Sequence, residues 1–344
     1  MRRFVLVAAL VSLMLAPVMA WSAPRVVVSI APVHHLVSGV MQGVGEPTLL
    51  IPPGASPHHY ALRPSDMRAL QAADVIIWVG PELESMLERS LQSVPSGVTQ
   101  VSLMKAPGMT LLPTREGGIW DAHDHGHGHG HDHGHDHNHG HDHNHGHNHS
   151  HDHGHNHNHD HNHNHGHDHH QHAEKDAHIW LSPDNAAAIV RQTRDTLSER
   201  DPSNAPSYAA NAEALLERLQ TLDTSLRSQL SAIDDRSFIV FHDAYQYFEQ
   251  HYGLTPAGSI TVDPSRAPGA QRVRELRQRI VGSDAICVFS EPQFEPRIVR
   301  TLTEGTTARS GVLDPLGAEL PTSPDSYFRL LENLAESMVT CLTN

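Results

Sequence analysis

A run of alternating histidines divides this chain and cannot itself form part of a folded core. Between His123 and His172 a histidine stands at almost every second position, so 26 of the 33 histidines fall within 50 residues. The spacers are Gly, Asp and Asn with one Ser and one Gln. No aliphatic or aromatic side chain is present to offset the entropy of ordering, so the run predicts a disordered loop. Neutral imidazole suits Zn, Cu, Ni and Co, so the run also indicates a late transition metal.

The first twenty residues are predicted to be a cleavable secretory signal. Arg2 and Arg3 precede an apolar stretch over residues 4–15, and residues 18–20 fit the small-residue rule at a cleavage site. We expect a soluble protein exported to the periplasm of a Gram-negative bacterium, without a lipid anchor because no Cys lies near the cleavage point. Removing Arg2 and Arg3 takes the formal net charge from −15 to −17. This acidity argues against nucleic acid as a partner.

Apolar runs that alternate with helical patterns predict two α/β lobes with parallel-type sheets. Strands are expected at residues 25–30, 48–51, 75–79 and 99–103 before the histidine run, and at 238–241, 255–260, 285–289 and 310–313 after it. Helices are expected at residues 33–44, 65–73, 82–93, 183–198, 244–251, 269–281, 295–304 and 327–341. Residues 207–233 keep the three-four apolar spacing of one long helix between the lobes.

These patterns divide the chain into four parts. We assign residues 1–20 to the signal peptide and 21–202 to an N-terminal α/β lobe that contains the disordered His-rich loop 121–173. Residues 203–235 form the linking helix, and 236–344 the C-terminal α/β lobe. A ligand site is expected in the cleft between the lobes.

The chain has two cysteines, Cys287 and Cys341. In an oxidising compartment an even pair most simply forms one disulfide, which here would clip the C-terminal helix to a strand and close a loop of 55 residues. Two metal thiolates are the alternative, and an oxidising compartment disfavours them.

Four isolated residues lie where α/β proteins bind ligands. His58 follows a strand and a Pro- and Gly-rich loop, and His242 and Asp314 each stand at the carboxyl end of a strand. His178 lies in an apolar setting just before a helix. Three imidazoles and one carboxylate make a suitable tetrahedral zinc set. Singly, each residue can also be a surface-turn His, a His held by a backbone carbonyl, or a turn Asp. The remaining histidines outside the run fit a metal site less well: His34, His35, His59 and His251.

The segments around these residues resemble the motifs of ZnuA-type proteins, the periplasmic zinc-binding components of high-affinity zinc ABC transporters. The matching segments are, in chain order, GASPHHYALRPSD, DAHIWLSP, FHDAYQYF, FSEPQF and LDPLG. They extend over essentially the whole mature chain, and the acidic His-rich run stands between the first and second of them, as in the family. Five ordered motifs are far more specific than any one of them.

The resemblance implies two (β/α) lobes bridged by a long rigid helix, with one Zn²⁺ in the cleft held by His58, His178 and His242. Asp314 matches the carboxylate that relatives carry in the LDPLG-like segment, and the fourth ligand is either Asp314 or water. Some zinc relatives carry a Glu just before the first His, where this chain has Pro57. Manganese-binding relatives replace the third His by a carboxylate, so His242 argues for zinc. The cysteine pair also matches the disulfide of zinc relatives.

The expected function is therefore capture of Zn²⁺, as transported ligand, and its delivery to an inner-membrane ABC permease. We expect no enzymatic activity, no small organic substrate and a monomer. The His-rich run is expected to be an accessory zinc collector whose binding weakens steeply below about pH 6, because free imidazole titrates near pH 6.5. The alternative for the run is a solvated segment that binds metal only incidentally.

Two other functions compete with this reading. A periplasmic buffer or chaperone for zinc, nickel or copper would explain the run but leave the rest of the chain unexplained. A zinc hydrolase would also use three protein ligands and water, and it needs a general base beside that water. No H-E-x-x-H segment occurs, and Glu291 is the only obvious candidate base.

Overall fold

The chain before the histidine run builds a four-stranded parallel sheet. The computed structural model describes residues 23–115, 174–261, 264, 268–282, 286–294 and 297–343. The strand order is β2-β1-β3-β4 and every neighbouring pair is parallel. The strands are β1 (Val26–Val28), β2 (Thr48–Leu49), β3 (Val75–Trp78) and β4 (Thr99–Ser102). β1 and β3 are wholly buried, which explains why they read as uninterrupted apolar runs.

Helices and short 3₁₀ turns connect and cover these strands. They are α1 (Ala31–Val40), α2 (Pro64–Ala72), α3 (Ser85–Leu91), and the 3₁₀ turn η1 (Leu103–Lys105). Each helix begins just after a strand or its loop, so the unit repeats the strand–helix alternation that parallel pairing requires. The loop between β2 and α2 contains Pro52, Pro53 and Pro57, which restrict φ and stiffen the segment that carries His58.

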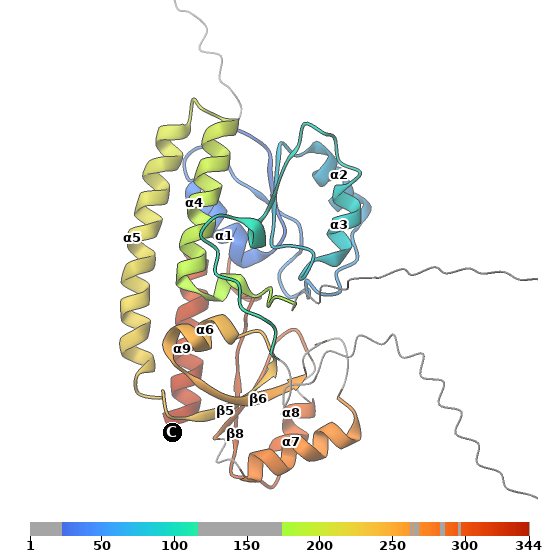
Figure 1. Ribbon diagram of the computed structural model, residues 1–344, viewed down its shortest axis with the longest axis vertical. Helices are drawn as coiled ribbons and strands as arrows, with labels where there is room; N and C mark the ends of the chain where they lie inside the picture. Colours follow the sequence, from blue (N-terminus) through green and yellow to red (C-terminus); the bar gives the residue numbers. More distant parts are fainter. Residues whose placement is uncertain are drawn as a thin grey trace, which may run out of the picture. The chain divides into compact units, whose positions relative to one another are not determined.

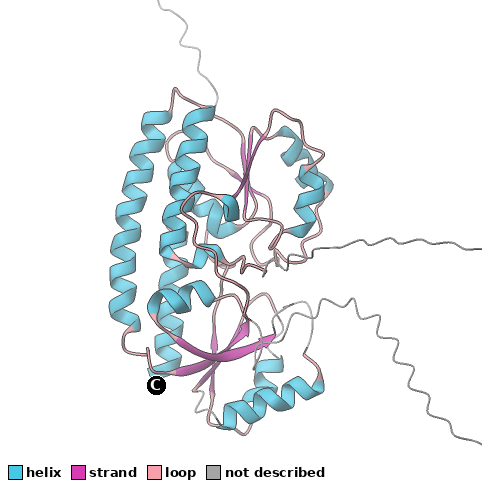
Figure 2. Ribbon diagram, viewed as in Figure 1, coloured by secondary structure: helices cyan, strands magenta, loops and turns pink. Residues whose placement is uncertain are grey.

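The chain after the run repeats the same sheet topology. The second sheet has the order β6-β5-β7-β8, again with parallel pairs only. Its strands are β5 (Ser237–His242), β6 (Thr255–Thr261), β7 (Cys287–Ser290) and β8 (Arg309–Val312). Its helices are α6 (Gln246–Tyr252), α7 (Ala270–Gly282), α8 (Arg297–Thr303) and α9 (Ser326–Thr343). Figure 2 shows the two sets of strands with helices packed around them.

Two long helices connect the two halves. The 3₁₀ turn η2 (Ile179–Leu181) leads into α4 (Pro183–Arg200), and α5 (Ala205–Leu230) lies alongside α4 (Figure 1). In its first half α5 packs so closely on α1 that a Cβ added at Gly39 would lie 2.7 Å from a Leu215 methyl. Further along, Arg227 of α5 donates to the His251 carbonyl of α6. The helix therefore contacts elements of both α/β lobes.

The predicted fold class is confirmed, and so is the cysteine pairing. Cys287 at the start of β7 and Cys341 in α9 form a disulfide, which excludes the thiolate alternative. Every predicted strand and helix is present, with ends that differ by a few residues. The signal peptide at residues 1–20 and the His-rich loop at 121–173 lie outside the described residues. The domain boundaries proposed above stay a prediction.

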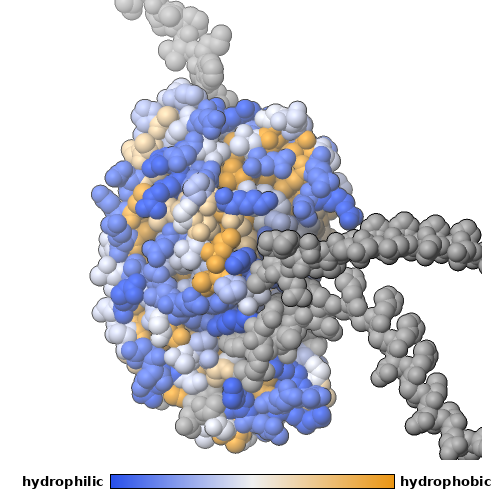
Figure 3. Space-filling model, in the orientation of Figure 1, coloured by the Kyte–Doolittle hydropathy of each residue, from blue (hydrophilic) through white to orange (hydrophobic). Residues whose placement is uncertain are grey.

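Few large apolar side chains are exposed on the described part of the chain. Within the described residues, no helix has the length and apolar character needed to cross a bilayer. On the face drawn in Figure 3, hydrophilic residues predominate and apolar ones form small groups. Among the described residues, the only large apolar side chains with high exposure are Val281 and Val312.

Candidate metal centre

Three histidines from separate segments meet in one place. His58 lies in the loop after β2, His178 immediately precedes η2, and His242 is the last residue of β5. One ring nitrogen of each lies within 4.8 Å of the others, and in the described part of the chain this is the one cluster of His, Cys, Asp or Glu that could hold a metal ion. The Nε2 atoms of His178 and His242 are 3.3 Å apart. Tetrahedral Zn–N bonds of about 2.0–2.1 Å would place two ligand nitrogens about 3.3–3.4 Å apart.

Asp176 orients His178. Its Oδ1 accepts a 2.7 Å hydrogen bond from Nδ1 of the His178 ring and a second one, 3.0 Å long, from the backbone N–H of the same residue. Both residues are buried. Because a carboxylate can only accept, Nδ1 carries the proton and the lone pair of Nε2 points at the other two histidines. This is the carboxylate–histidine pairing that second-shell groups make around bound zinc.

Glu291 orients His242 in the same way. The His242 ring donates from Nδ1 to Glu291 Oε1 at 2.6 Å, and its backbone N–H contacts the same oxygen at 3.4 Å. The register of the sheet explains this contact. β5 and β7 are parallel neighbours that pair Phe238 with Cys287, so His242 and Glu291 stand at the same level, at the carboxyl ends of the two strands. Burial disfavours a charged His242, but Glu291 outweighs it and raises the pKa of His242.

His58 completes the cluster from the other half of the chain. Its ring centroid lies 5.4 Å from that of His178 and 5.8 Å from that of His242. Burial, followed by the repulsion of the other two imidazoles, holds the pKa of His58 well below its usual range. The His58 ring is thus kept neutral, which is the form that binds metal.

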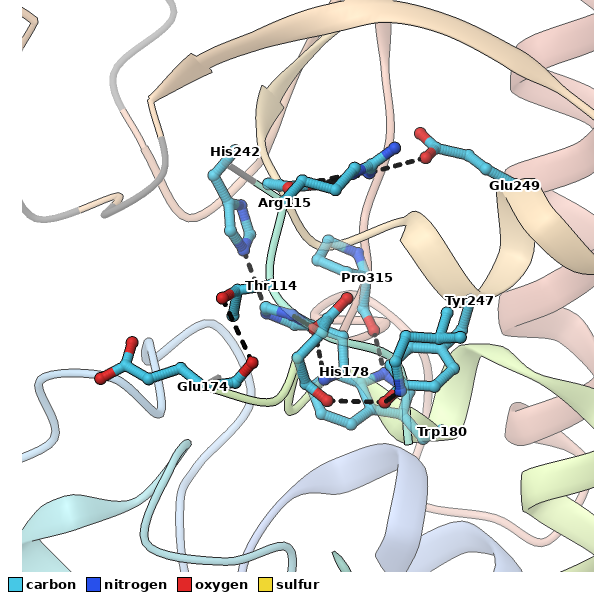
Figure 4. Close-up of polar contacts among 12 residues, drawn as sticks. Thr114, Arg115, Glu174, His178, Trp180, His242, Tyr247, Glu249 and Pro315 are labelled. Atoms are coloured by element: carbon cyan, nitrogen blue, oxygen red, sulfur yellow. Dashed lines mark hydrogen bonds and ion pairs between the residues drawn. The ribbon is translucent and has the colours of Figure 1, made fainter. Parts of the chain in front are cut away.

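An apolar shell surrounds the three rings. Trp180 packs with its ring centroid 5.3 Å from that of His178 and donates from its indole N–H to the Pro315 carbonyl at 2.7 Å. Figure 4 shows His178, His242 and Trp180 together with this bond. Besides the three histidines and the polar Ser56, Glu291 and Gln293, five apolar residues line a small cavity between the rings: Pro57, Trp180, Phe294, Pro315 and Leu316. The apolar part of this lining lowers the local dielectric constant, which strengthens the attraction between a cation and its ligands.

Asp314 is not brought into the cluster. It follows β8 at the carboxyl end of the second sheet, as predicted, but its side-chain oxygens face their own turn. They accept from the backbone N–H groups of Leu316, Gly317 and Ala318 at 2.6–3.0 Å, and from the Gln293 side chain at 2.8 Å. The turn-Asp alternative describes these contacts. To reach the histidines, Asp314 would have to give up these hydrogen bonds.

The four remaining histidines outside the run are not part of the metal centre. His34 contacts the Pro47 carbonyl through Nε2, and His35 is buried in α1, where burial lowers its pKa to about 4. His251 pairs with Asp223 at 2.7 Å, and His59 is exposed beside His58. The residue missed by sequence reasoning is Asp176. A signal was available, because an Asp two positions before a buried His can reach its backbone N–H and its ring together.

Glu291→Gln is expected to weaken zinc binding about tenfold, and Glu291→Ala up to about a hundredfold, because loss of a ligand's orienting partner has effects of this size. Glutamine still offers one acceptor to Nδ1, whereas alanine leaves His242 without it. Competition with a calibrated chelator, in a chain lacking residues 124–170, measures the change. Glu319→Gln, an exposed residue of the same half, is the matched control. Equal affinities for the Glu291→Ala variant and the parent would refute the orienting role.

The comparisons with known proteins point to one family. Residues 26–341 match the family model described as ZnuA, zinc-uptake complex component A, periplasmic. A Brucella suis protein named high-affinity zinc uptake system protein ZnuA is 49% identical over 318 residues, which cover 92% of this chain and 91% of the relative. A Brucella abortus protein of the same name is 50% identical over 317 residues, with the same coverage. A crystal structure of ZnuA superposes with a TM-score of 0.69 over 93% of this chain and 99% of the other; at 22% identity this likeness shows the fold.

Proposed function

The chain belongs to the ZnuA family of periplasmic zinc-uptake components, and from this premise we propose that it captures one Zn²⁺ between His58, His178 and His242 and delivers it to an ABC permease of the inner membrane. The family is a transport component and not an enzyme. Zn²⁺ is therefore the transported ligand. A leader at residues 1–20 exports the protein, which works as a monomer with the permease.

One observation carries this proposal. Asp176 and Glu291 accept hydrogen bonds from the Nδ1 atoms of His178 and His242, which leaves the two Nε2 atoms facing each other across 3.3 Å. Two neutral imidazole nitrogens that face each other in this way repel unless a proton or a metal ion lies between them. Buried carboxylates hold this arrangement, which supports a site whose ligands are oriented by the fold.

The donor set favours zinc over harder ions. Three neutral imidazoles suit Zn²⁺, whereas Mn²⁺ prefers oxygen-rich sites. Water takes the fourth position in our proposal, since the Asp314 oxygens already accept four hydrogen bonds. The contact of Glu291 with His242 also argues against a hydrolase, because the one candidate base is used to orient a ligand.

The His-rich run has a supporting role in the proposal. Histidines spaced by two, with Gly, Asp and Asn between them, are suited to holding several ions weakly and not to forming one tetrahedron, so we propose that the run collects zinc for the cleft site. Deleting residues 124–170 tests both parts. We expect calorimetric titration to count one tight zinc per shortened chain and additional weak ions on the full chain. Slower growth of cells carrying the shortened chain is expected in zinc-depleted medium.

The two parts of the proposal fail separately. Loss of the tight site from the shortened chain would show that the run, and not the cleft, is the main site. Unchanged stoichiometry together with unchanged growth at low zinc would remove the collector role while leaving the cleft site in place.

A further inference from the structure

Arg115 makes a buried ion-pair cluster with the C-terminal lobe. Its Nε donates to both carboxylate oxygens of Asp243, at 3.0 and 3.1 Å, and a terminal nitrogen contacts Asp243 Oδ1 as well. The same terminal nitrogen lies 2.8 Å from Glu249 Oε2 in α6. The Asp243 and Glu249 side chains are only 8% and 2% exposed, and that of Arg115 is 19% exposed. Figure 4 shows Arg115 reaching Glu249.

The backbone next to Arg115 is tied to the segment that carries His178. Thr114 N–H donates to the Glu174 carbonyl at 2.9 Å, and Asp176 N–H donates to the Leu112 carbonyl at 3.0 Å. The Tyr247 hydroxyl of α6 joins these two segments, since it donates to the Asp176 carbonyl at 2.7 Å and accepts from Leu112 N–H at 3.1 Å. The two segments that flank the His-rich run in the sequence are thus paired antiparallel and fixed to α6.

Together these contacts connect the segment that carries His178 to the segment that carries His242. Asp243 directly follows the ligand His242, and Asp176 orients the ligand His178. Arg115 connects the backbone of the Asp176 segment to Asp243. Moving His178 away from His242 would therefore break a buried ion pair and leave uncompensated charges in the interior, which is strongly unfavourable. An exposed ion pair would give way much more easily.

We propose that Arg115 is a positioning residue that holds the His178 and His242 parts of the metal centre together and thereby slows the release of zinc. This inference rests on the proposed function, because it concerns the ion held by those histidines. It gives a role to the buried carboxylates Asp243 and Glu249, which contact no metal-binding histidine in the way that Asp176 and Glu291 do.

The test measures zinc release from the full chain. Protein loaded with one equivalent of Zn²⁺ is mixed with excess chelator, and the slow phase of release reports the cleft ion, since ions on the run leave faster. Arg115→Met is expected to accelerate the slow phase at least tenfold, as loss of a ligand-positioning partner does. The triple variant Arg115→Met/Asp243→Asn/Glu249→Gln carries no unpaired charge. It should recover the melting temperature of the parent while still releasing zinc fast.

Controls separate this inference from the proposed function. Arg218→Met removes an exposed ion pair to Asp325 with a comparable 2.7 Å contact and should release zinc at the parent rate. In His178→Ala the slow phase should vanish, and its persistence would overturn the proposed site itself. If the slow phase vanishes there, but Arg115→Met or the triple variant releases zinc at the parent rate, the positioning role of Arg115 is wrong.

Discussion

Replacing His58, His178 and His242 by alanine in a chain that lacks residues 124–170 is expected to abolish equimolar tight zinc binding. The three ring nitrogens lie within 4.8 Å of one another, and they supply every protein ligand in our proposal. Each single replacement should weaken binding by more than about a hundredfold, because removal of a ligand exceeds the effect of removing its hydrogen-bond partner. Chelator competition measures the dissociation constants, and the melting temperature with and without zinc reports the same loss independently.

His59→Ala is the matched control for His58→Ala. The two rings are neighbours with centroids 6.2 Å apart, and both changes remove one imidazole from the same loop. We expect His59→Ala to bind zinc as tightly as the parent chain. Tight binding of one zinc by the triple alanine variant would show that the ion sits elsewhere, and the assignment of the centre would have to be abandoned.

The fold was largely predictable because the central strands of its two sheets, β1, β3, β5 and β7, are short and largely buried. A strand of a parallel sheet has both faces covered, so β3 and the apolar part of β5 appear as unbroken apolar runs that need no alternation to be recognised. Helix ends were less predictable. The expected start of α2 at Ser65 is wrong: the helix begins at Pro64, and the Asp66 carboxylate accepts from Arg63 N–H at 2.7 Å. Proline favours the first helical position, which moves the start one residue earlier.

The candidate site was predictable where local patterns decide it. A strand end followed by a His or Asp marks the ligand edge of an α/β sheet, and His242 lies where this rule places it. The same rule selected Asp314, and here local chemistry intervenes. An Asp before a proline can accept from the N–H groups that follow it, and Asp314 does so with three of them. The position of Asp314 at the ligand edge of the sheet did not predict the direction in which its carboxylate points.

Contacts between distant segments were beyond single-sequence reasoning. Glu291 contacts His242 because β5 and β7 are neighbours in a fixed register. Local sequence patterns do not predict the order of strands in a sheet. Arg115 and Asp243 are separated by 128 residues, with the whole histidine run between them. Their pairing depends on how the flanking segments of that run meet α6, and composition gives no sign of it.

The disulfide differs from these contacts, because compartment and cysteine count were enough to predict it. Cys287 is fully buried at the start of β7, and Cys341 is nearly so in α9. The bond fits a crowded place: a Cβ added at Gly311 of β8 would lie 2.6 Å from the Phe289 ring and 3.4 Å from Cys341 Sγ. Glycine at this position leaves room for the Phe289 ring, which packs next to the disulfide.

Cys287→Ser/Cys341→Ser is therefore expected to lower the free energy of unfolding by about 4 kcal/mol, the chain-entropy value for a closed loop of about 55 residues. For a folded part of this size that corresponds to a fall in melting temperature of about 8 °C. Both cysteines are replaced so that no free thiol can form bonds between molecules.

Reduction of the parent with dithiothreitol should give the same fall in melting temperature, and dithiothreitol should not change the melting temperature of the double variant. Zinc stoichiometry should stay at one per chain without residues 124–170, because the bond holds α9 on the second sheet and contributes no ligand. An unchanged melting temperature would mean that the packing of α9, whose Leu331 and Met338 are fully buried, restrains the loop without the covalent bond.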